Sequence, residues 1–193
     1  MTDLLEEVRR VQHEAELVHS EQAVQSAIGR LAEEITLALA DSNPLVLCVM
    51  TGGLIPVGWL LPKLRFPLQL DYVHATRYRG DTKGHELERR VWPGISVRDR
   101  VVLLVDDIFD EGVTVSRIVR DCCGQGAHQV FTAVLVKKLH DRAGSNMQPD
   151  FIGLTTPDRY LFGCGLDYKN YLRNLPAIYA VSGMNTPNGT HHD

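Results

Sequence analysis

The sequence contains no apolar run that approaches the roughly 20 residues of a membrane-spanning helix. Its first residues, Met-Thr-Asp-Leu-Leu-Glu-Glu, lack the basic start and apolar core of a secretion signal. We therefore expect a cytoplasmic protein with no membrane partner. Positive charge is not in excess either, because 20 Lys and Arg are outnumbered by 24 Asp and Glu, which gives a net charge of −4. This balance argues against nucleic acid as the main partner.

Cysteine is scarce, with four residues in 193. Cys48 and Cys164 lie in apolar or glycine-rich contexts and Cys122 and Cys123 are adjacent, so the spacing forms neither a disulfide framework nor a metal-ligand pattern. A metal site formed by the adjacent pair with His128 is one interpretation, but we favour reduced, partly buried thiols. With 44% hydrophobic and 23% charged residues, the composition is typical of an ordinary globular protein.

The most informative stretch begins with the apolar run Val101–Val105, which is typical of a strand buried in a parallel sheet. Asp106 and Asp107 follow where that strand is expected to end, Asp110 lies in the next loop, and Thr114 opens a helical pattern. Open α/β sheets bind ligands beyond the carboxyl ends of their strands, and a helix N-terminus there offers free N–H groups to a phosphate. The stretch predicts a phosphate-binding loop with three acids, although acidic residues after a strand can also be simply solvated.

Hydrophobic periodicity predicts alternating helices and strands along the rest of the chain. Two N-terminal helices are expected over about 3–40, the second capped by Ser20. Their apolar faces are Leu4, Val8, Val11, Ala15 and Val18 in the first, and Val24, Ala27, Ile28, Leu31, Ile35 and Leu39 in the second. Further strands are expected at 45–50, 68–76, 130–136, 151–155 and 177–181, with a helix from Ile55 to about Pro62. We predict one α/β domain over 1–184, with a twisted, mainly parallel sheet flanked by helices, and a disordered tail over 185–193.

Two further segments are candidates for function. The turn Thr51-Gly52-Gly53 lies between a predicted strand and a predicted helix, and its glycines would let an anion approach the backbone closely. The polar segment from Tyr78 to Arg90 is either a mobile lid or a solvated hairpin, and composition alone does not choose between them.

From about Leu45 to Val181 the segments together resemble the hypoxanthine-guanine phosphoribosyltransferases, which are type I phosphoribosyltransferases. Met50-Thr51-Gly52-Gly53 resembles their pyrophosphate loop, Thr76-Arg77-Tyr78 the start of their flexible loop, Val105–Val115 their loop for phosphoribosyl pyrophosphate (PRPP), and Val134–Lys137 their lysine-bearing strand. Pro149–Phe151, then Tyr160–Tyr168 with Arg173, resembles their purine-binding hood. The resemblance implies a small C-terminal hood and transfer of ribose 5-phosphate from PRPP to hypoxanthine or guanine, giving IMP or GMP and pyrophosphate.

The resemblance also implies individual roles. Asp106 and Asp107 would hold the ribose hydroxyls and Mg²⁺, and Asp167 would support a second Mg²⁺. Pyrophosphate would meet Arg173 and the turn Thr51, Gly52 and Gly53, and the 5′-phosphate would meet the backbone of Glu111, Gly112, Val113 and Thr114. Asp110 would take the purine N7 proton and Lys137 would donate to the 6-oxo group. Tyr160 would stack on the purine, while the backbone of Leu161 and Asp167 would read its exocyclic edge. Arg77 and Tyr78 would belong to the flexible loop.

Two residues depart from the family pattern, and two alternatives stay open. Glu111 replaces a threonine of the PRPP loop, which loses a hydroxyl contact, and Asp106 replaces the glutamate of many purine enzymes. One alternative is a preference for xanthine, because nothing in the sequence identifies the group that meets the purine 2-position. The other is a PRPP-binding nucleic-acid regulator of the same fold, which the retained acids and the net charge argue against. Family members are commonly dimers or tetramers, which implies a homodimer or homotetramer.

Overall fold

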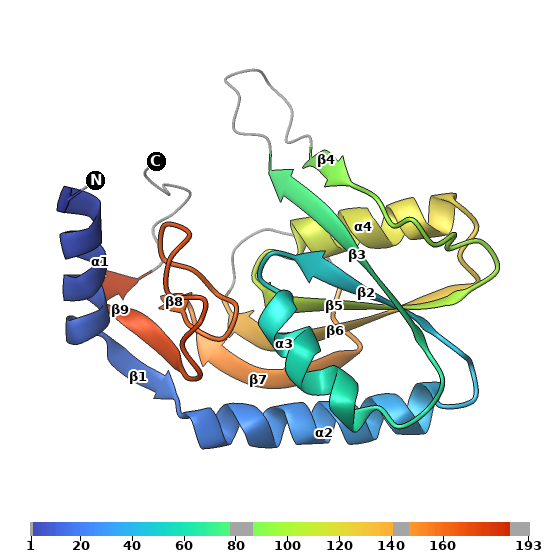
Figure 1. The fold of residues 1–193 in the computed structure, drawn as a ribbon, viewed down its shortest axis with the longest axis horizontal. Coiled ribbons are helices and arrows are strands. Elements are labelled where there is room, and N and C mark those ends of the chain that lie inside the picture. The colour runs from blue at the N-terminus through green and yellow to red at the C-terminus, as the bar shows by residue number, and fades with distance from the viewer. Residues whose placement is uncertain (1, 78–86, 141–146, 186–193) are drawn as a thin grey trace.

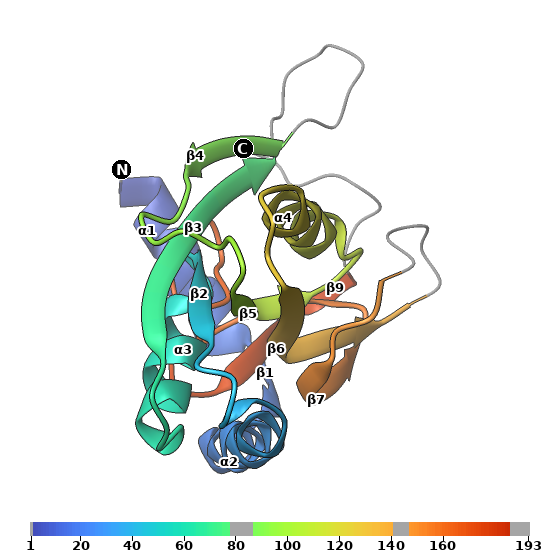
Figure 2. The ribbon, with the colours of Figure 1, turned by 90° about the vertical axis from the view of Figure 1, so that its right-hand side faces the viewer.

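A six-stranded sheet is the largest element of the fold, and a smaller sheet lies at one end of it (Figure 1). The computed structural model describes residues 2–77, 87–140 and 147–185. The strand order is β4-β3-β2-β5-β6-β7, and every neighbouring pair is parallel except β3 with β4. The strands are β2 (Leu45–Met50), β3 (Gln69–Arg77), β4 (Leu87–Val91), β5 (Val101–Phe109), β6 (Gln129–Leu139) and β7 (Phe151–Pro157). The predicted twisted, mainly parallel sheet is confirmed, and its twist is visible in Figure 2.

The central strands β5 and β6 are longer than their apolar runs predict. β5 continues to Phe109, so Asp106 and Asp107 lie inside the strand rather than after it. β6 likewise includes Lys137. The cause is pairing between the strands, because Asp106 lies opposite Val134 and Phe109 opposite Lys137. Backbone hydrogen bonds form regardless of side-chain polarity, so the ladder continues past the point where the apolar run ends.

Helices cover both faces of the sheet (Figure 2). They are α2 (Glu21–Leu39) and α3 (Leu54–Leu60), with the 3₁₀ turn η1 (Leu61–Lys63), on one face, and α4 (Val113–Gly124) on the other. Ser20 caps α2 as predicted, because its Oγ accepts the N–H of Ala23 at 3.2 Å. The predicted apolar face of α2 is buried throughout: Val24, Ala27, Ile28, Leu31, Ile35 and Leu39.

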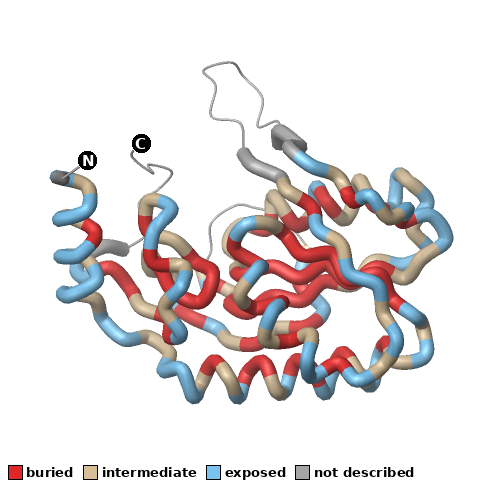
Figure 3. The backbone as a smooth tube through the Cα atoms, viewed as in Figure 1, coloured by how far each residue is buried: buried red, intermediate tan, exposed pale blue. Residues whose placement is uncertain are grey.

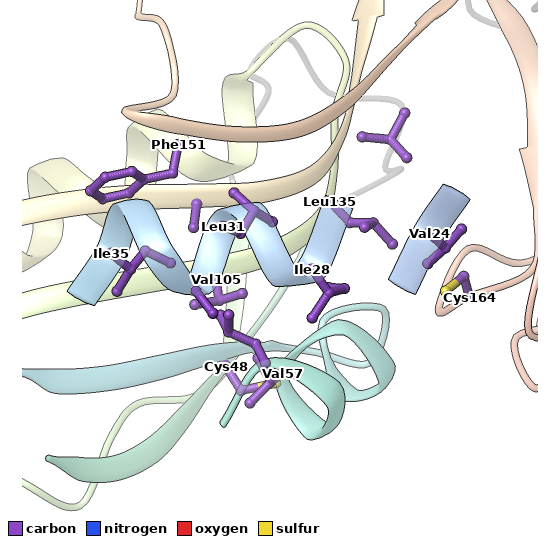
Figure 4. Packing of buried hydrophobic residues seen from close by; sticks show 14 of the residues in the cluster. Val24, Ile28, Leu31, Ile35, Cys48, Val57, Val105, Leu135, Phe151 and Cys164 are labelled. Carbon is purple, nitrogen blue, oxygen red and sulfur yellow. The ribbon is translucent and has the colours of Figure 1, made fainter. Parts of the chain in front are cut away.

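Two hydrophobic cores result, one on each side of the sheet, and the buried residues concentrate along its central strands (Figure 3). The α2 side is the larger core. Figure 4 shows how it joins the helix to the strands, to α3 and to the C-terminal region; among its members are Ile28, Leu31, Val57, Val105, Leu135 and Cys164. On the other face, Val115, Ile118 and Cys122 of α4 pack against the sheet.

A three-stranded antiparallel sheet with strand order β1-β9-β8 forms the hood. Its elements are β1 (Glu16–His19), β8 (Arg159–Phe162) and β9 (Ile178–Asn185), with helix α1 (Thr2–Glu14) packed on β9. The prediction that the first helix extends to Val18 is wrong, because residues 16–19 pair with β9 instead. The hood is therefore built from both ends of the chain and not from the C-terminal segment alone. β9 also reaches Asn185, where the tail was expected to begin.

Some of the sequence predictions concern residues outside the ranges that the structure describes. Tyr78 lies outside the described residues, as do 186–193, and the side chain of Arg77 at the end of β3 is not described. β4 pairs antiparallel with β3, as the hairpin interpretation predicts, whereas the lid interpretation stays a prediction. Within the described ranges, no helix combines the length and hydrophobicity needed to cross a membrane.

Candidate active site

The candidate residues gather at the carboxyl edge of the larger sheet, where the hood lies (Figure 1). Parallel strands end at the same edge, so the turn after β2, the ends of β5 and β6 and the start of α4 meet there. β7 leads directly into β8, which brings the hood segment to the same edge.

Asp106 and Asp107 form a buried acid pair at the centre of this edge. The N–H of Asp107 donates to Asp106 Oδ1 at 2.9 Å. Burial raises the pKa of both carboxyl groups, and the negative charge of Asp107 raises the pKa of Asp106 further. The pair therefore holds a proton more readily than a carboxyl group in water does. Such a pair favours a cation or hydroxyl donors as its ligand.

The turn at Thr51-Gly52-Gly53 lies against this pair. A Cβ atom on Gly52 would be 2.0 Å from Asp107 Oδ2, so only glycine allows the carboxylate to approach the turn so closely. The N–H of Gly53 donates to the carbonyl of Val49 at 2.9 Å, and the peptide bond between Met50 and Thr51 is cis. Thr51 itself is exposed, so a ligand can reach this turn from solvent.

A hood loop closes the other side of the turn. Gly165 has a positive φ of 101°, and a Cβ there would be 2.1 Å from the carbonyl oxygen of Gly52. Arg173 donates from Nη1 to the carbonyl of Gly165 at 2.6 Å, and its Nη2 is 2.6 Å from Asp167 Oδ1. The Arg173 charge lowers the pKa of Asp106 and Asp107, against the larger effect of burial. The structure thus brings Arg173 and Asp167 to the acid pair.

The loop before α4 has the geometry of an anion site. Gly112 precedes the helix with φ of 71°, and a Cβ there would be 2.3 Å from Cζ of Phe109. The helix begins at Val113, one residue before the predicted start at Thr114. The first N–H groups of a helix have no partner within it and carry the positive end of its dipole, which suits a phosphate. Glu111 is half-buried beside this loop.

Asp110 is held by two residues near the end of β6. Its Oδ1 is 2.7 Å from His140 Nε2, and its Oδ2 is 3.3 Å from Lys138 Nζ. The ammonium group of Lys138 is also 3.5 Å from Asp158 Oδ1, and that lysine side chain is buried. Lys137 instead donates to Gln148 Oε1. The structure therefore places Lys138, and not Lys137, next to Asp110.

The aromatic part of the site lies on β8. The ring of Tyr160 meets the ring of Tyr168 edge-on, with centroids 5.7 Å apart and an interplanar angle of 70°. The side chain of Leu161 is buried in the α2-side core, so only its backbone is available to a ligand.

Comparison with known proteins agrees with this arrangement. Residues 14–169 match the family model of the phosphoribosyl transferase domain. The chain belongs to the phosphoribosyltransferase family. It is 30% identical over 160 residues to the hypoxanthine-guanine phosphoribosyltransferase of Bacillus subtilis (strain 168), covering 82% of this chain and 88% of that one. It is 28% identical over 177 residues to the hypoxanthine-guanine-xanthine phosphoribosyltransferase of Tritrichomonas foetus, covering 92% and 93%. A solved structure of a hypoxanthine-guanine-xanthine phosphoribosyltransferase superposes with a TM-score of 0.78 at 27% identity, covering 86% of this chain and 96% of that one.

Sequence reasoning did not predict the contacts of three residues around the candidate base of this phosphoribosyltransferase: Lys138, His140 and Asp158. The neighbouring residues Lys137 and Lys138 are a local signal for one of these contacts. Adjacent strand residues point to opposite faces, so the two lysines must have different partners. The apolar pattern ended at Val136, however, and the family resemblance placed only Lys137 on the strand, so Lys138 was not recognised as part of it. His140 had no local pattern to mark it.

The donor set of this phosphoribosyltransferase fits Mg²⁺. No cluster of three or more His, Cys, Asp or Glu side chains in the described part of the chain is arranged to hold a metal. Mg²⁺ needs only one or two carboxylates when substrate oxygens and waters complete its shell. Asp106 and Asp107 supply two buried carboxylates, and burial raises the pKa of each, so a bound cation would stabilise their charged forms. Asp167 fits less directly, because both its oxygens already contact protein, Oδ1 with Arg173 and Oδ2 with the N–H of Asn170.

Proposed function

We propose that this phosphoribosyltransferase transfers ribose 5-phosphate from PRPP to hypoxanthine or guanine, giving IMP or GMP and pyrophosphate. The observation that carries this proposal is the order of sites along the sheet edge. Three neighbouring sites match the three parts of PRPP in the same spatial order. The α4 N-terminus suits the 5′-phosphate, the acid pair Asp106–Asp107 suits the ribose hydroxyls, and the turn at Gly52 with Arg173 suits the pyrophosphate. The names of the relatives support the purine as acceptor.

PRPP would bind by its two anionic ends. The backbone N–H groups of Glu111, Gly112, Val113 and Thr114 would donate to the 5′-phosphate, because the helix N-terminus favours negative charge. Asp106 and Asp107 would accept from the ribose hydroxyls. Thr51, Gly52, Gly53 and the planar fork of Arg173 would meet the pyrophosphate.

Mg²⁺ would be held by Asp106 and Asp107 and supported by Asp167. When bound, it would neutralise charge that develops on the leaving pyrophosphate. The cation would also offset the burial cost that raises the pKa of the acid pair.

Asp110 would act as the general base. As purine N9 forms its bond to ribose C1′ and the bond from C1′ to pyrophosphate breaks, the N7 proton passes to the Asp110 carboxylate. Its contacts with His140 and Lys138 support this role, because both groups fix the orientation of the carboxylate.

The purine would be recognised from two sides. Tyr160 would stack on its face, and the backbone of Leu161 and Asp167 would read its exocyclic edge. Lys137 would donate to the 6-oxo group, as the family resemblance implies. Lys138 is the second candidate for this donation, because it is the lysine beside Asp110. Adenine lacks the 6-oxo acceptor and would leave the lysine unpaired, which is a strong basis for rejection.

A broader acceptor range is the second candidate function. The Tritrichomonas foetus relative is named for xanthine as well as hypoxanthine and guanine. A 6-oxo donor and an aromatic stack fit all three bases, so xanthine belongs among the substrates to be tested.

The proposal also covers the cellular compartment and the oligomeric state. The four cysteines are free, as suits the cytoplasm. A homodimer or homotetramer is supported by the exposed apolar side chains of Leu54, Leu70 and Tyr72 on α3 and β3, which a second subunit could cover. Light scattering after size exclusion measures the mass directly, and a monomer at assay concentration would contradict this part.

The central test is pyrophosphate release from PRPP and Mg²⁺ with each of hypoxanthine, guanine, xanthine and adenine. We expect release with hypoxanthine or guanine and none with adenine. Absence of release with both 6-oxopurines would overturn the function. Asp110→Asn should lower turnover by about 10²–10⁴-fold while PRPP binding, measured by calorimetry, changes little. Asp41→Asn removes an exposed carboxylate in the loop before β2 and serves as the matched control.

A further inference from the structure

Helix α1 lies almost entirely outside the segment that matches the family, because the match begins at Glu14, the last residue of α1 (Thr2–Glu14). It is nonetheless not a separate appendage. It packs on β9 of the hood, at the end of the molecule far from α4 (Figure 1). Val8 of α1 shares a small hydrophobic core with Phe162, Tyr168 and Leu172 of the hood.

Glu7 makes the polar connection from α1 to the hood. Its carboxylate accepts the hydroxyl hydrogen of Tyr168, and Lys169 Nζ lies 2.9 Å from Oε1 and 3.0 Å from Oε2. The Tyr168 hydrogen bond and then the Lys169 contacts lower the pKa of Glu7, so the side chain is a carboxylate at neutral pH. Burial and the bond to Glu7 raise the pKa of Tyr168 to about 12, so its hydroxyl remains a donor.

Tyr168 in turn contacts one residue of the proposed purine site and directly follows another in the chain. Its ring meets Tyr160 edge-on at 5.7 Å between centroids, in an arrangement that aromatic pairs favour. In sequence it directly follows Asp167, whose Oδ2 accepts the N–H of Asn170 at 2.7 Å. Tyr168 and Tyr171 also exchange backbone hydrogen bonds at 3.0 and 2.8 Å.

The hood turn that carries these residues adopts backbone conformations that are uncommon for residues other than glycine. Lys169, Asn170 and Leu172 all have positive φ values, of 49°, 66° and 66°. Such conformations cost free energy for residues other than glycine and are held by surrounding contacts. Among those contacts are Glu7 on Lys169 and the α1 core on Leu172.

We propose that α1 is a positioning element of the purine site, acting through Glu7, which fixes Tyr168 and thereby the ring of Tyr160 and the backbone of Asp167. The inference rests on the proposed function for the identity of the ligand. Glu7 touches no substrate in this scheme, so it is a positioning residue. Its loss should weaken purine binding more than PRPP binding. Most of the proposed PRPP contacts come from the acid pair, the turn at Gly52 and the loop before α4, and only Arg173 and Asp167 come from the hood.

The kinetic test compares Glu7→Ala with Glu6→Ala, an exposed neighbour on the same helix. For Glu7→Ala we expect KM for the purine to rise roughly five- to tenfold, about the effect of losing one ordinary hydrogen bond, with KM for PRPP within about twofold of wild type. Tyr168→Phe should raise the purine KM similarly, and the double variant should be no worse than the stronger single one. A merely structural role would lower thermal stability and leave the ratio of the two KM values unchanged, which would overturn the proposal.

Hydrogen exchange provides a second measurement that does not depend on activity. Amides between 160 and 173 should exchange faster in full-length Glu7→Ala than in Glu6→Ala, while those of β5 and α4 remain unchanged. Unchanged exchange over 160–173 in Glu7→Ala would overturn the proposal, even for a protein that released no pyrophosphate with any of the purines tested. If the wild type releases pyrophosphate with a 6-oxopurine and Glu7→Ala leaves both KM values unchanged, the positioning role is overturned and the proposed function stands.

Discussion

Lys137 and Lys138 are neighbours in β6, yet their ammonium groups have different partners. Lys138 is buried between Asp110 and Asp158, whereas Lys137 reaches Gln148. Because adjacent strand residues project to opposite faces, one lysine cannot replace the other without a shift of register. Purine selectivity can therefore be assigned to one of them by experiment.

We predict that substituting the two lysines changes different kinetic parameters. Lys137→Met should lower kcat/KM for hypoxanthine by roughly 10- to 150-fold, the effect of one hydrogen bond from a charged donor, and should weaken discrimination against adenine. Lys138→Met should lower kcat with little change in selectivity, because Asp110 loses a cation that orients it. Steady-state kinetics with both bases distinguishes the two outcomes. Selectivity lost in Lys138→Met and retained in Lys137→Met would transfer the 6-oxo contact to Lys138.

The buried acid pair should lower the free energy of unfolding at neutral pH. Burial raises the pKa of Asp106, so the folded protein binds a proton at that carboxyl more tightly than the unfolded chain does. Stability from this group is present below the unfolded pKa and is lost as pH rises through the raised folded pKa. Asp106→Asn removes that loss and keeps an Oδ1 acceptor for the N–H of Asp107. We expect the variant to be more stable above the folded pKa, with a gain of about 1 kcal/mol raising Tm by roughly 2–4 °C.

Thermal unfolding from pH 4 to pH 8 without PRPP or metal measures this difference. The gap between variant and wild type should shrink as the pH falls, and Asp41→Asn should show no such gap. A less stable Asp106→Asn at pH 8 would contradict the burial argument.

At the residue level, local sequence order indicated the region of the site and missed contacts that depend on strand pairing. Asp106, Asp107 and Gly112 were singled out by the order of residue types after an apolar run, and Arg173 by the family resemblance; their roles stay predictions. The contacts of Lys138 and His140 with Asp110 could not be predicted, since nothing local shows how far a strand ladder extends beyond its apolar core.

At the level of elements, the same cause explains the errors in boundaries. α2 was predicted to its cap because helix contacts are local and Ser20 is a strong capping residue. The first helix was predicted too long because Val18 continues the apolar spacing of Leu4, Val8 and Val11. The chain leaves the helix there to pair with β9, about 160 residues away in sequence. No local pattern contains that partner, so the N-terminal share of the hood could not be predicted.

The contact between hood and sheet depends on a glycine pair. Gly165→Ala should destabilise the protein and raise KM for PRPP, because φ of 101° disfavours alanine and its Cβ would lie 2.1 Å from the backbone oxygen of Gly52. Gly29→Ala in the interior of α2 is the matched control, since no atom lies within 4 Å of its added Cβ. That control should gain about 0.5–1 kcal/mol. Urea unfolding and PRPP kinetics test both variants, and a Gly165→Ala protein with normal stability and KM would refute the contact.

On the scale of the whole molecule, part of the hood shares a core with the larger sheet. Cys164 and Leu161 of the hood belong to the same buried cluster as Cys48 of β2 and Leu135 of β6 (Figure 4). The site therefore lies at the junction of two sheets that are joined by continuous apolar packing and not by a flexible hinge. A shared core of this kind predicts that the hood and the sheet unfold together.

The cysteines allow that prediction to be measured. Burial raises the pKa of Cys48 and of Cys164 to about 12, so both remain thiols at pH 8, and Cys122 is fully buried. Cys123 is exposed. A disulfide-forming reagent at pH 8 should therefore modify one thiol per native chain rapidly, and Cys123→Ser should abolish that phase. In increasing urea, Cys48 and Cys164 should become reactive at the same midpoint. Labelling of Cys164 at distinctly lower urea than Cys48 would show that the hood opens on its own and that the two sheets are not one cooperative unit.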